Sequence, residues 1–193
     1  MISDLARWQR RIKPEKRRTP LAYSDRSALP FFPDVQPSGP VMLDTCAYID
    51  ALNGRMPLAL QAALAGRRHF HCTVCLGELT FGIGAIDPRS RRAAADRAKI
   101  EQMLTHIEVK RTVTLSAGGW LGAGLIAGML GRIQNADRAD RRRYLADTVI
   151  YLAALSAGAT LITANWRDFD LIGQIVGDAD DRGRMLFYAP ADG

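Results

Sequence analysis

Two neighbouring runs of sequence decide the fold: Leu145-Ala146-Asp147-Thr148-Val149-Ile150-Tyr151-Leu152-Ala153-Ala154 and, after Gly158, Ala159-Thr160-Leu161-Ile162-Thr163. The first run is helix-like and largely apolar, and it carries an acid, Asp147. The second predicts a short strand, and polar residues follow it at Asn165, Arg167 and Asp168. Because ligands of open α/β sheets bind at the carboxyl ends of the strands, this pattern predicts a site where the strand ends.

Further acids occupy comparable positions elsewhere in the chain. Asp44 directly follows the apolar run 41–43, and Glu78 lies in the run Thr73-Val74-Cys75-Leu76-Gly77-Glu78-Leu79. Together with Asp147 and Asp168, these residues predict that three or four carboxylates converge in one pocket.

The rest of the body alternates between strand-like and helix-like segments. Strands are expected at 41–43, 69–72, 107–112, 160–163 and 185–188. Helices are expected at 47–53, 57–65, 74–86 with Thr73 as N-cap, 89–106, 117–133 and 139–157. This alternation predicts a three-layer α/β/α fold around a central, mostly parallel sheet.

Residues 1–40 differ in composition from residues 41–193, which are expected to form the folded domain. The extension holds eight of the 26 Lys and Arg residues and four of the 20 Asp and Glu residues, so it carries most of the net charge of +6. Ile2, Leu5, Trp8 and Ile12 recur at helical spacing and predict a short basic amphipathic helix. Docking on the domain or on a second subunit is favoured over membrane binding. A basic arm suits an anionic partner such as RNA, and a solubilising, partly disordered tail is the alternative.

Composition further limits the class of protein to which the sequence can belong. With 193 residues, of which 48% are hydrophobic, the chain can bury a core and is not disordered as a whole. Three cysteines and an N-terminus without the apolar core of a secretory signal predict the reduced cytoplasm. His69, His71, Cys72 and Cys75 are zinc-ligand types, but His71 and Cys72 are adjacent in a strand-like segment and point to opposite faces, which favours structural roles.

The segment 112–131 has no charge over 20 residues and contains six glycines. Its length reaches that of a membrane span. A buried helix is favoured instead, and Gly124-x-x-x-Gly128 suggests close packing within the domain or across a dimer.

Four blocks of the chain, in order, resemble the PIN-domain nucleases, and most closely the toxin ribonucleases of the VapC type. The blocks are Asp44-Thr45, Glu78-Leu79 with Gly82-Ile83, Asp147 with Ile150, Ala153 and Ala154, and Thr163-x-Asn165-x-x-Asp168-Phe169. The resemblance covers roughly residues 40 to 190. It implies a divalent-metal-dependent endoribonuclease that forms a homodimer and pairs with an antitoxin protein in a type II toxin–antitoxin system.

The resemblance also implies the roles of individual residues. The catalytic and metal-binding acids would be Asp44, Glu78, Asp147 and Asp168. The substrate or water contacts would be Thr45, Thr163, Asn165, Arg142, Arg143 and Arg167. Each acid also has a structural alternative: Asp44 as a helix cap, Glu78 in a salt bridge, Asp147 as a structural salt-bridge partner, and Asp168 as the cap of a short helix. Either Asn165 or Asp168 is the fourth ligand.

The acids themselves indicate the chemistry. Clustered carboxylates repel one another unless some stay protonated or a cation lies among them. Oxygen ligands favour Mg²⁺ or Mn²⁺, which can activate water and stabilise the charge that develops at a phosphate. Two alternatives stay open: a non-catalytic nucleic-acid-binding module, and an RNA-processing nuclease without an antitoxin. The 40-residue extension is not explained by the resemblance.

Overall fold

The computed structural model describes residues 1–177 and 184–191. The helices are α1 (Ile2–Ile12), α2 (Thr45–Leu52), α3 (Leu58–Leu64), α4 (Thr73–Ala85), α5 (Ala93–Thr105), α6 (Ala117–Ile133), α7 (Arg138–Ser156) and α8 (Trp166–Val176), with 3₁₀ turns at Arg26–Ala28 and Val109–Arg111. The strands are β1 (Val41–Leu43), β2 (His69–Cys72), β3 (Thr112–Val113), β4 (Thr160–Thr163) and β5 (Met185–Phe187).

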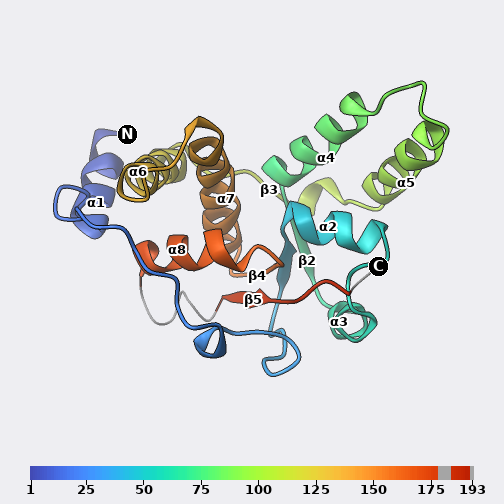
Figure 1. Cartoon of the computed structure of the whole chain (residues 1–193), viewed down its shortest axis with the longest axis horizontal. Helices are drawn as coiled ribbons and strands as arrows, with labels where there is room; N and C mark the ends of the chain where they lie inside the picture. The colour runs from blue at the N-terminus through green and yellow to red at the C-terminus, as the bar shows by residue number, and fades with distance from the viewer. Residues whose placement is uncertain (178–183, 192–193) are drawn as a thin grey trace.

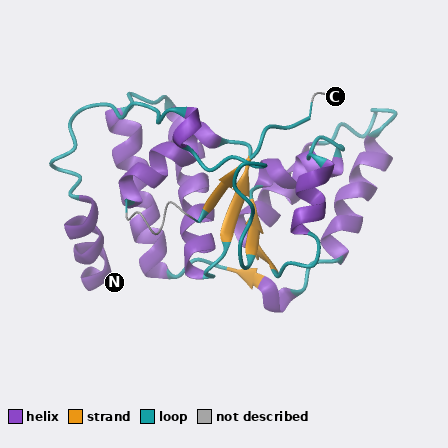
Figure 2. Ribbon diagram, turned by 90° about the horizontal axis from the view of Figure 1, so that it is seen from below, coloured by secondary structure: helices purple, strands orange, loops and turns teal. Residues whose placement is uncertain are grey.

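The strands form one parallel sheet in the order β3-β2-β1-β4-β5. Helices cover both faces: α1, α6, α7 and α8 lie on one side, and α2 to α5 on the other (Figures 1 and 2). The expected three-layer fold with a parallel sheet is therefore confirmed. The chain leaves β1 toward β2 on one side, while β4 and β5 lie on the other. The carboxyl ends of β1 and β4 thus form the topological switch point, where ligands of such sheets bind.

The central strands are buried because both faces of a parallel sheet are covered. Every residue of β1, β4 and β5 is buried, and the core is completed by aromatic residues such as Tyr151 and Phe169. Gly158 turns the chain from α7 into β4 with φ +63°, a conformation that glycine adopts without a steric penalty.

Several expected boundaries were wrong, for local reasons. Thr73 is the first residue of α4, and the cap position is Cys72, whose side chain makes no capping hydrogen bond. The helix expected from residue 89 begins at Ala93, because Asp87 accepts the backbone N–H of Arg89 in a turn. The strand expected at 107–112 contains the 3₁₀ turn Val109–Arg111, and β3 begins only at Thr112. The helix after β4 is not short but runs for 11 residues.

Helix α1 packs on α6, and its Trp8 and Ile12 join the core of the domain, whereas Ile2 at the start of the apolar stripe is 88% exposed. Trp8 donates its indole N–H to the carbonyl of Gly118, at 2.9 Å, and its ring covers Gly122. The chain then runs along α6 and α8 to the sheet, where Phe31 pairs with Phe187 in β5. The extension therefore contacts the body at both the helical layer and the edge of the sheet.

Helix α6 occupies most of the uncharged segment and is 17 residues long. Within the described residues, no helix combines the length and hydropathy needed to cross a bilayer.

Candidate active site

Asp44 lies at the switch point, between the end of β1 and the start of α2. Its backbone N–H donates to the carbonyl of Ile162 in β4, at 3.0 Å, which holds the two strand ends together. Its carboxylate caps α2 by accepting the N–H of Thr45 at 2.7 Å. Its other oxygen, Oδ2, accepts the hydroxyl of Thr163 at 2.7 Å. The capping role and a place in the acid site therefore coexist.

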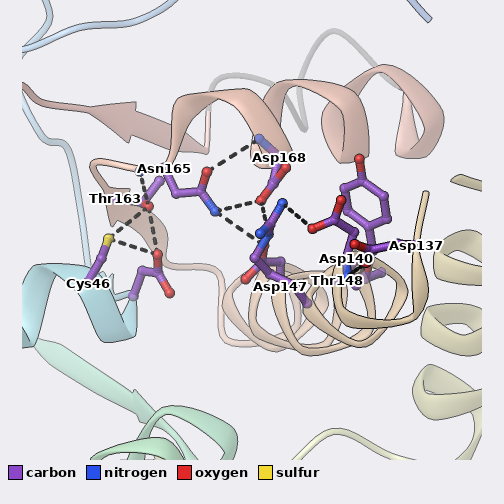
Figure 3. A network of polar contacts seen from close by, with 11 residues as sticks. Cys46, Asp137, Asp140, Asp147, Thr148, Thr163, Asn165 and Asp168 are labelled. Atoms are coloured by element: carbon purple, nitrogen blue, oxygen red, sulfur yellow. Dashed lines mark hydrogen bonds and ion pairs between the residues drawn. The ribbon is translucent and has the colours of Figure 1, made fainter. Parts of the chain in front are cut away.

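The side-chain amide of Asn165 lies between the carboxylates of Asp147 and Asp168. Asn165 donates from Nδ2 to Asp147 at 3.3 Å and to Asp168 at 3.1 Å (Figure 3). The amide oxygen of Asn165 caps α8 by accepting the N–H of Asp168, at 3.5 Å. In this arrangement Asn165 points its amide nitrogen toward the two acids and its amide oxygen toward the start of α8. The oxygen that faces the site therefore comes from Asp168 and not from Asn165.

Glu78 approaches the site from α4. Thr45 donates its hydroxyl to Glu78 Oε2, and this hydrogen bond joins Glu78 to the start of α2. The sequence neighbours of Glu78 are mostly apolar, but the residue is exposed on α4. The cost of a buried, unpaired carboxylate therefore does not arise for it. Its carboxyl group is still partly shielded from solvent, and that shielding, with the charge of Asp44, raises its pKa.

The four acids form one electrostatic unit. Burial, together with the charges of Asp44, Asp168 and Glu78, raises the pKa of Asp147 to about 9, although the charge of Arg143 opposes the shift. Burial also raises the pKa of Asp44. Asp44, Asp147 and Asp168 are only 4%, 7% and 6% exposed, so their repulsion is weakly screened by water.

The acids supply the oxygen donors that a hard divalent cation prefers. Their carboxylates do not surround a single point in this structure. In residues 1–177 and 184–191, no group of three or more His, Cys, Asp and Glu side chains is arranged to hold a metal ion as it stands. The amide of Asn165 lies between Asp147 and Asp168. The donors are carboxylate oxygens, which suit Mg²⁺ or Mn²⁺, and their mutual repulsion is the kind that a cation relieves.

Two contacts of the site were not predicted. Cys46 donates its thiol to Asp44 Oδ2, at 3.0 Å, and accepts the backbone N–H of Ala164. Arg143 donates from Nε to Asp168 Oδ2 at 2.7 Å. Cys46 lies two residues after Asp44 at the start of a helix. This spacing is the sequence pattern from which the contact between the two side chains could have been predicted. The ion pair joins residues 25 positions apart, and no local pattern indicates it.

Of the expected substrate contacts, Thr45, Thr163, Asn165 and Arg143 lie in the acid site. Arg142 and Arg167 are exposed, and the guanidinium of Arg167 lies 5.4 Å from the centre of the Trp166 ring. Among the described contacts of the four acids, neither arginine takes part.

The histidines of the zinc-like cluster have other partners. His71 Nδ1 shares a hydrogen bond with the hydroxyl of Tyr48, at 2.6 Å, and His69 Nε2 lies 3.2 Å from the carbonyl of Leu64. Cys75 is buried and donates to the carbonyl of Leu43. These contacts are the structural roles that the sequence favoured.

The sequence matches no family model and no curated protein. Solved structures, in contrast, resemble the fold. A chain in the crystal structure of DNA-bound VapBC from Salmonella typhimurium superposes with a TM-score of 0.53 at 20% identity, over 78% of this chain and 98% of that one. A chain of VapBC2 from Rickettsia felis, bound to a DNA fragment from its promoter, gives 0.51 at 18% identity over the same shares. The PIN-like fold inferred from the four sequence blocks is thereby confirmed.

Proposed function

We propose that this PIN-like protein is a metal-dependent endoribonuclease and the toxin of a type II toxin–antitoxin pair. The observation that carries the proposal is the placement of three buried acids, Asp44, Asp147 and Asp168, around the switch point of the sheet, with Glu78 joined to the start of α2 through Thr45 and with the pKa values of Asp44, Glu78 and Asp147 raised. Buried acids that destabilise one another are a cost to folding, and such clusters occur at functional sites. The solved relatives are VapBC complexes, which supports an antitoxin partner.

Asp44, Asp147, Asp168 and Glu78 would hold the Mg²⁺ or Mn²⁺ ion. When bound, a hard cation lowers the pKa of a water molecule and stabilises the negative charge that develops on a phosphate. The protein supplies the orientation. Thr163 and Cys46 fix the carboxylate of Asp44, and Thr45 fixes that of Glu78. The proposed reaction is hydrolysis of a phosphodiester bond without a covalent protein intermediate.

The proposed substrate is RNA, and the proposed location is the cytoplasm. A net charge of +6 attracts a polyanion, and Arg142, Arg143 and Arg167 stand on α7 and α8 beside the acids in sequence. Guanidinium groups pair with phosphate oxygens in a bidentate manner. A non-catalytic binding module is less well supported, because acids that face a polyanion would weaken binding.

The nuclease activity is tested by metal removal. We expect purified protein to cleave single-stranded or structured RNA with Mg²⁺ or Mn²⁺, and EDTA to abolish cleavage, because the acids alone repel the phosphate. Activity should return when Mn²⁺ is added in excess over EDTA. Equal cleavage after exhaustive chelation would show that the metal mechanism is wrong. Tight RNA binding without cleavage at any divalent ion would favour the binding module.

We also propose a homodimer that uses the exposed part of α6. The covered part of this helix, at Gly118 and Gly122, is occupied by α1. Gly124 and Gly128 are exposed instead, and a Cβ atom added at either would meet no atom within 4 Å. We expect a dimer by sedimentation at about 20 μM, a concentration at which stable interfaces persist. Gly124→Glu should yield a folded monomer, and a parent protein that sediments as a monomer would contradict the proposal.

A further inference from the structure

The guanidinium group of Arg143 occupies the acid site in the structure. It joins two carboxylates: Nε donates to Asp168 Oδ2 at 2.7 Å, and Nη2 lies 3.1 Å from Asp140 Oδ1. Asp168 Oδ2 is also the oxygen that accepts the amide of Asn165, which in turn contacts Asp147. The positive charge of Arg143 therefore lies beside Asp168, at one end of the group of acids that would bind a cation.

The two partners of this ion pair differ in exposure. The side chain of Asp168 is 9% exposed, so its carboxylate cannot be satisfied by bulk water and requires a partner. The side chain of Arg143 is 53% exposed and projects from the first half of α7. A half-exposed arginine can turn into solvent at little cost, whereas Asp168 is fixed by the backbone of α8. Any rearrangement at this pair would therefore move Arg143.

We propose that Arg143 is the resident counter-ion of the metal-free site, that a divalent cation displaces it from Asp168, and that the freed guanidinium then binds a phosphate of the RNA. This inference rests on the metal site of the proposed function. Arg143 and a divalent cation compete for the same oxygen of Asp168, and two cations cannot share it without repulsion. Metal loading and substrate capture would thus be coupled, because the arginine is available to phosphate only after metal has bound.

The coupling predicts opposite effects on metal affinity and on RNA turnover for Arg143→Gln. Mn²⁺ affinity, measured from the electron paramagnetic resonance signal of free Mn²⁺, should rise about two- to fivefold, the range expected for loss of a competing half-exposed ion pair. Cleavage at saturating Mn²⁺ should fall, chiefly through a higher KM for RNA. Arg143→Lys, which keeps the charge but lacks the planar fork, should give intermediate values.

Arg138→Gln is the matched control, because it removes the same charge from an exposed position of the same helix. It should leave Mn²⁺ affinity within error of the parent. Melting temperatures with and without Mn²⁺ provide a second readout: the stabilisation by Mn²⁺ should be larger for Arg143→Gln than for Arg138→Gln, because metal then replaces a missing counter-ion.

The outcomes separate this inference from the proposed function. If the parent binds Mn²⁺ and Arg143→Gln binds it equally or more weakly than Arg138→Gln, Arg143 is a structural partner of Asp168 and the inference is wrong. If the affinities change as expected but no variant cleaves RNA, the counter-ion role stands and the ribonuclease assignment is wrong. If the parent binds no Mn²⁺ at millimolar concentration, the metal site is wrong and the inference is overturned with it.

Discussion

Asp147→Asn is expected to lower the rate of RNA cleavage by about 100-fold or more, the scale for loss of one electrostatic contact in a transition state. Asparagine keeps the shape of the side chain but removes one negative ligand charge. Because Asp147 is destabilised by burial and by three other acids, the metal-free variant should be at least as stable as the parent. The measurements are the cleavage rate with Mn²⁺ and the melting temperature with EDTA.

Asp147→Asn should also change how the stability of the protein depends on pH. The pKa of Asp147 is about 9 in the folded protein and 3.8 as its ordinary value. The folded state therefore holds this proton more tightly than the unfolded state between these two values, and stability falls as pH rises through that window. With EDTA, the melting temperature of the parent should fall from pH 5 to pH 8. Asp147→Asn lacks this contribution and should show a flatter profile.

Asp34→Asn is the control, because it makes the same chemical change on an exposed loop of the extension. It should leave cleavage and its pH profile unchanged. If Asp147 is instead a structural partner in a buried pair, its substitution would lower the free energy of unfolding by about 3–5 kcal/mol. A variant that melts much lower than the parent yet cleaves normally at low temperature would remove Asp147 from the active site.

Trp8→Ala is expected to produce a large loss of stability for a residue of the extension. The indole ring fills a notch on α6 that exists only because residue 122 is glycine: a Cβ atom there would lie 2.2 Å from Trp8 Cε2. Truncation of a buried tryptophan costs about 3–5 kcal/mol, and Trp8 is partly buried, so we expect about 2–4 kcal/mol. For a protein of this size, that corresponds to a fall in melting temperature of about 4–16 °C.

Gly122→Ala tests the same contact from the other side and should also lower the melting temperature, because the added methyl group meets the ring. Leu58→Ala is the control, since Leu58 is 82% exposed. An unchanged melting temperature for both Trp8→Ala and Gly122→Ala would show that α1 does not depend on this notch.

The sequence predicted the architecture well because its signals are local. The alternation around Asp147 and the strand that ends at Thr163 follow from runs of apolar residues, and α6 was expected with its observed bounds. The position of Asp44 directly after β1 followed from the same kind of pattern. The short strand β3 and the start of α5 were less well predicted, because turn contacts between side chain and backbone decided them.

The details of the site could not be predicted from local patterns. The orientation of the Asn165 amide depends on the cap of α8, and the contact of Arg143 with Asp168 depends on how α7 and α8 pack. The sequence neighbours of Glu78 are mostly apolar, yet α4 turns this residue outward. In the sequence of the extension, the only recognisable pattern is an apolar stripe at helical spacing. The path of the extension along α6 and α8 to β5 is set by contacts with residues more than 100 positions away.

The central claim is that the acids at the switch point form one divalent-metal site. Anomalous diffraction from a crystal soaked in Mn²⁺ tests it most directly. We predict a Mn²⁺ peak bounded by carboxylate oxygens of Asp44, Asp147 and Asp168, with Glu78 beside it and the guanidinium of Arg143 moved off Asp168. A Mn²⁺ peak elsewhere, or none at this site in protein that cleaves RNA only with Mn²⁺, would contradict the claim.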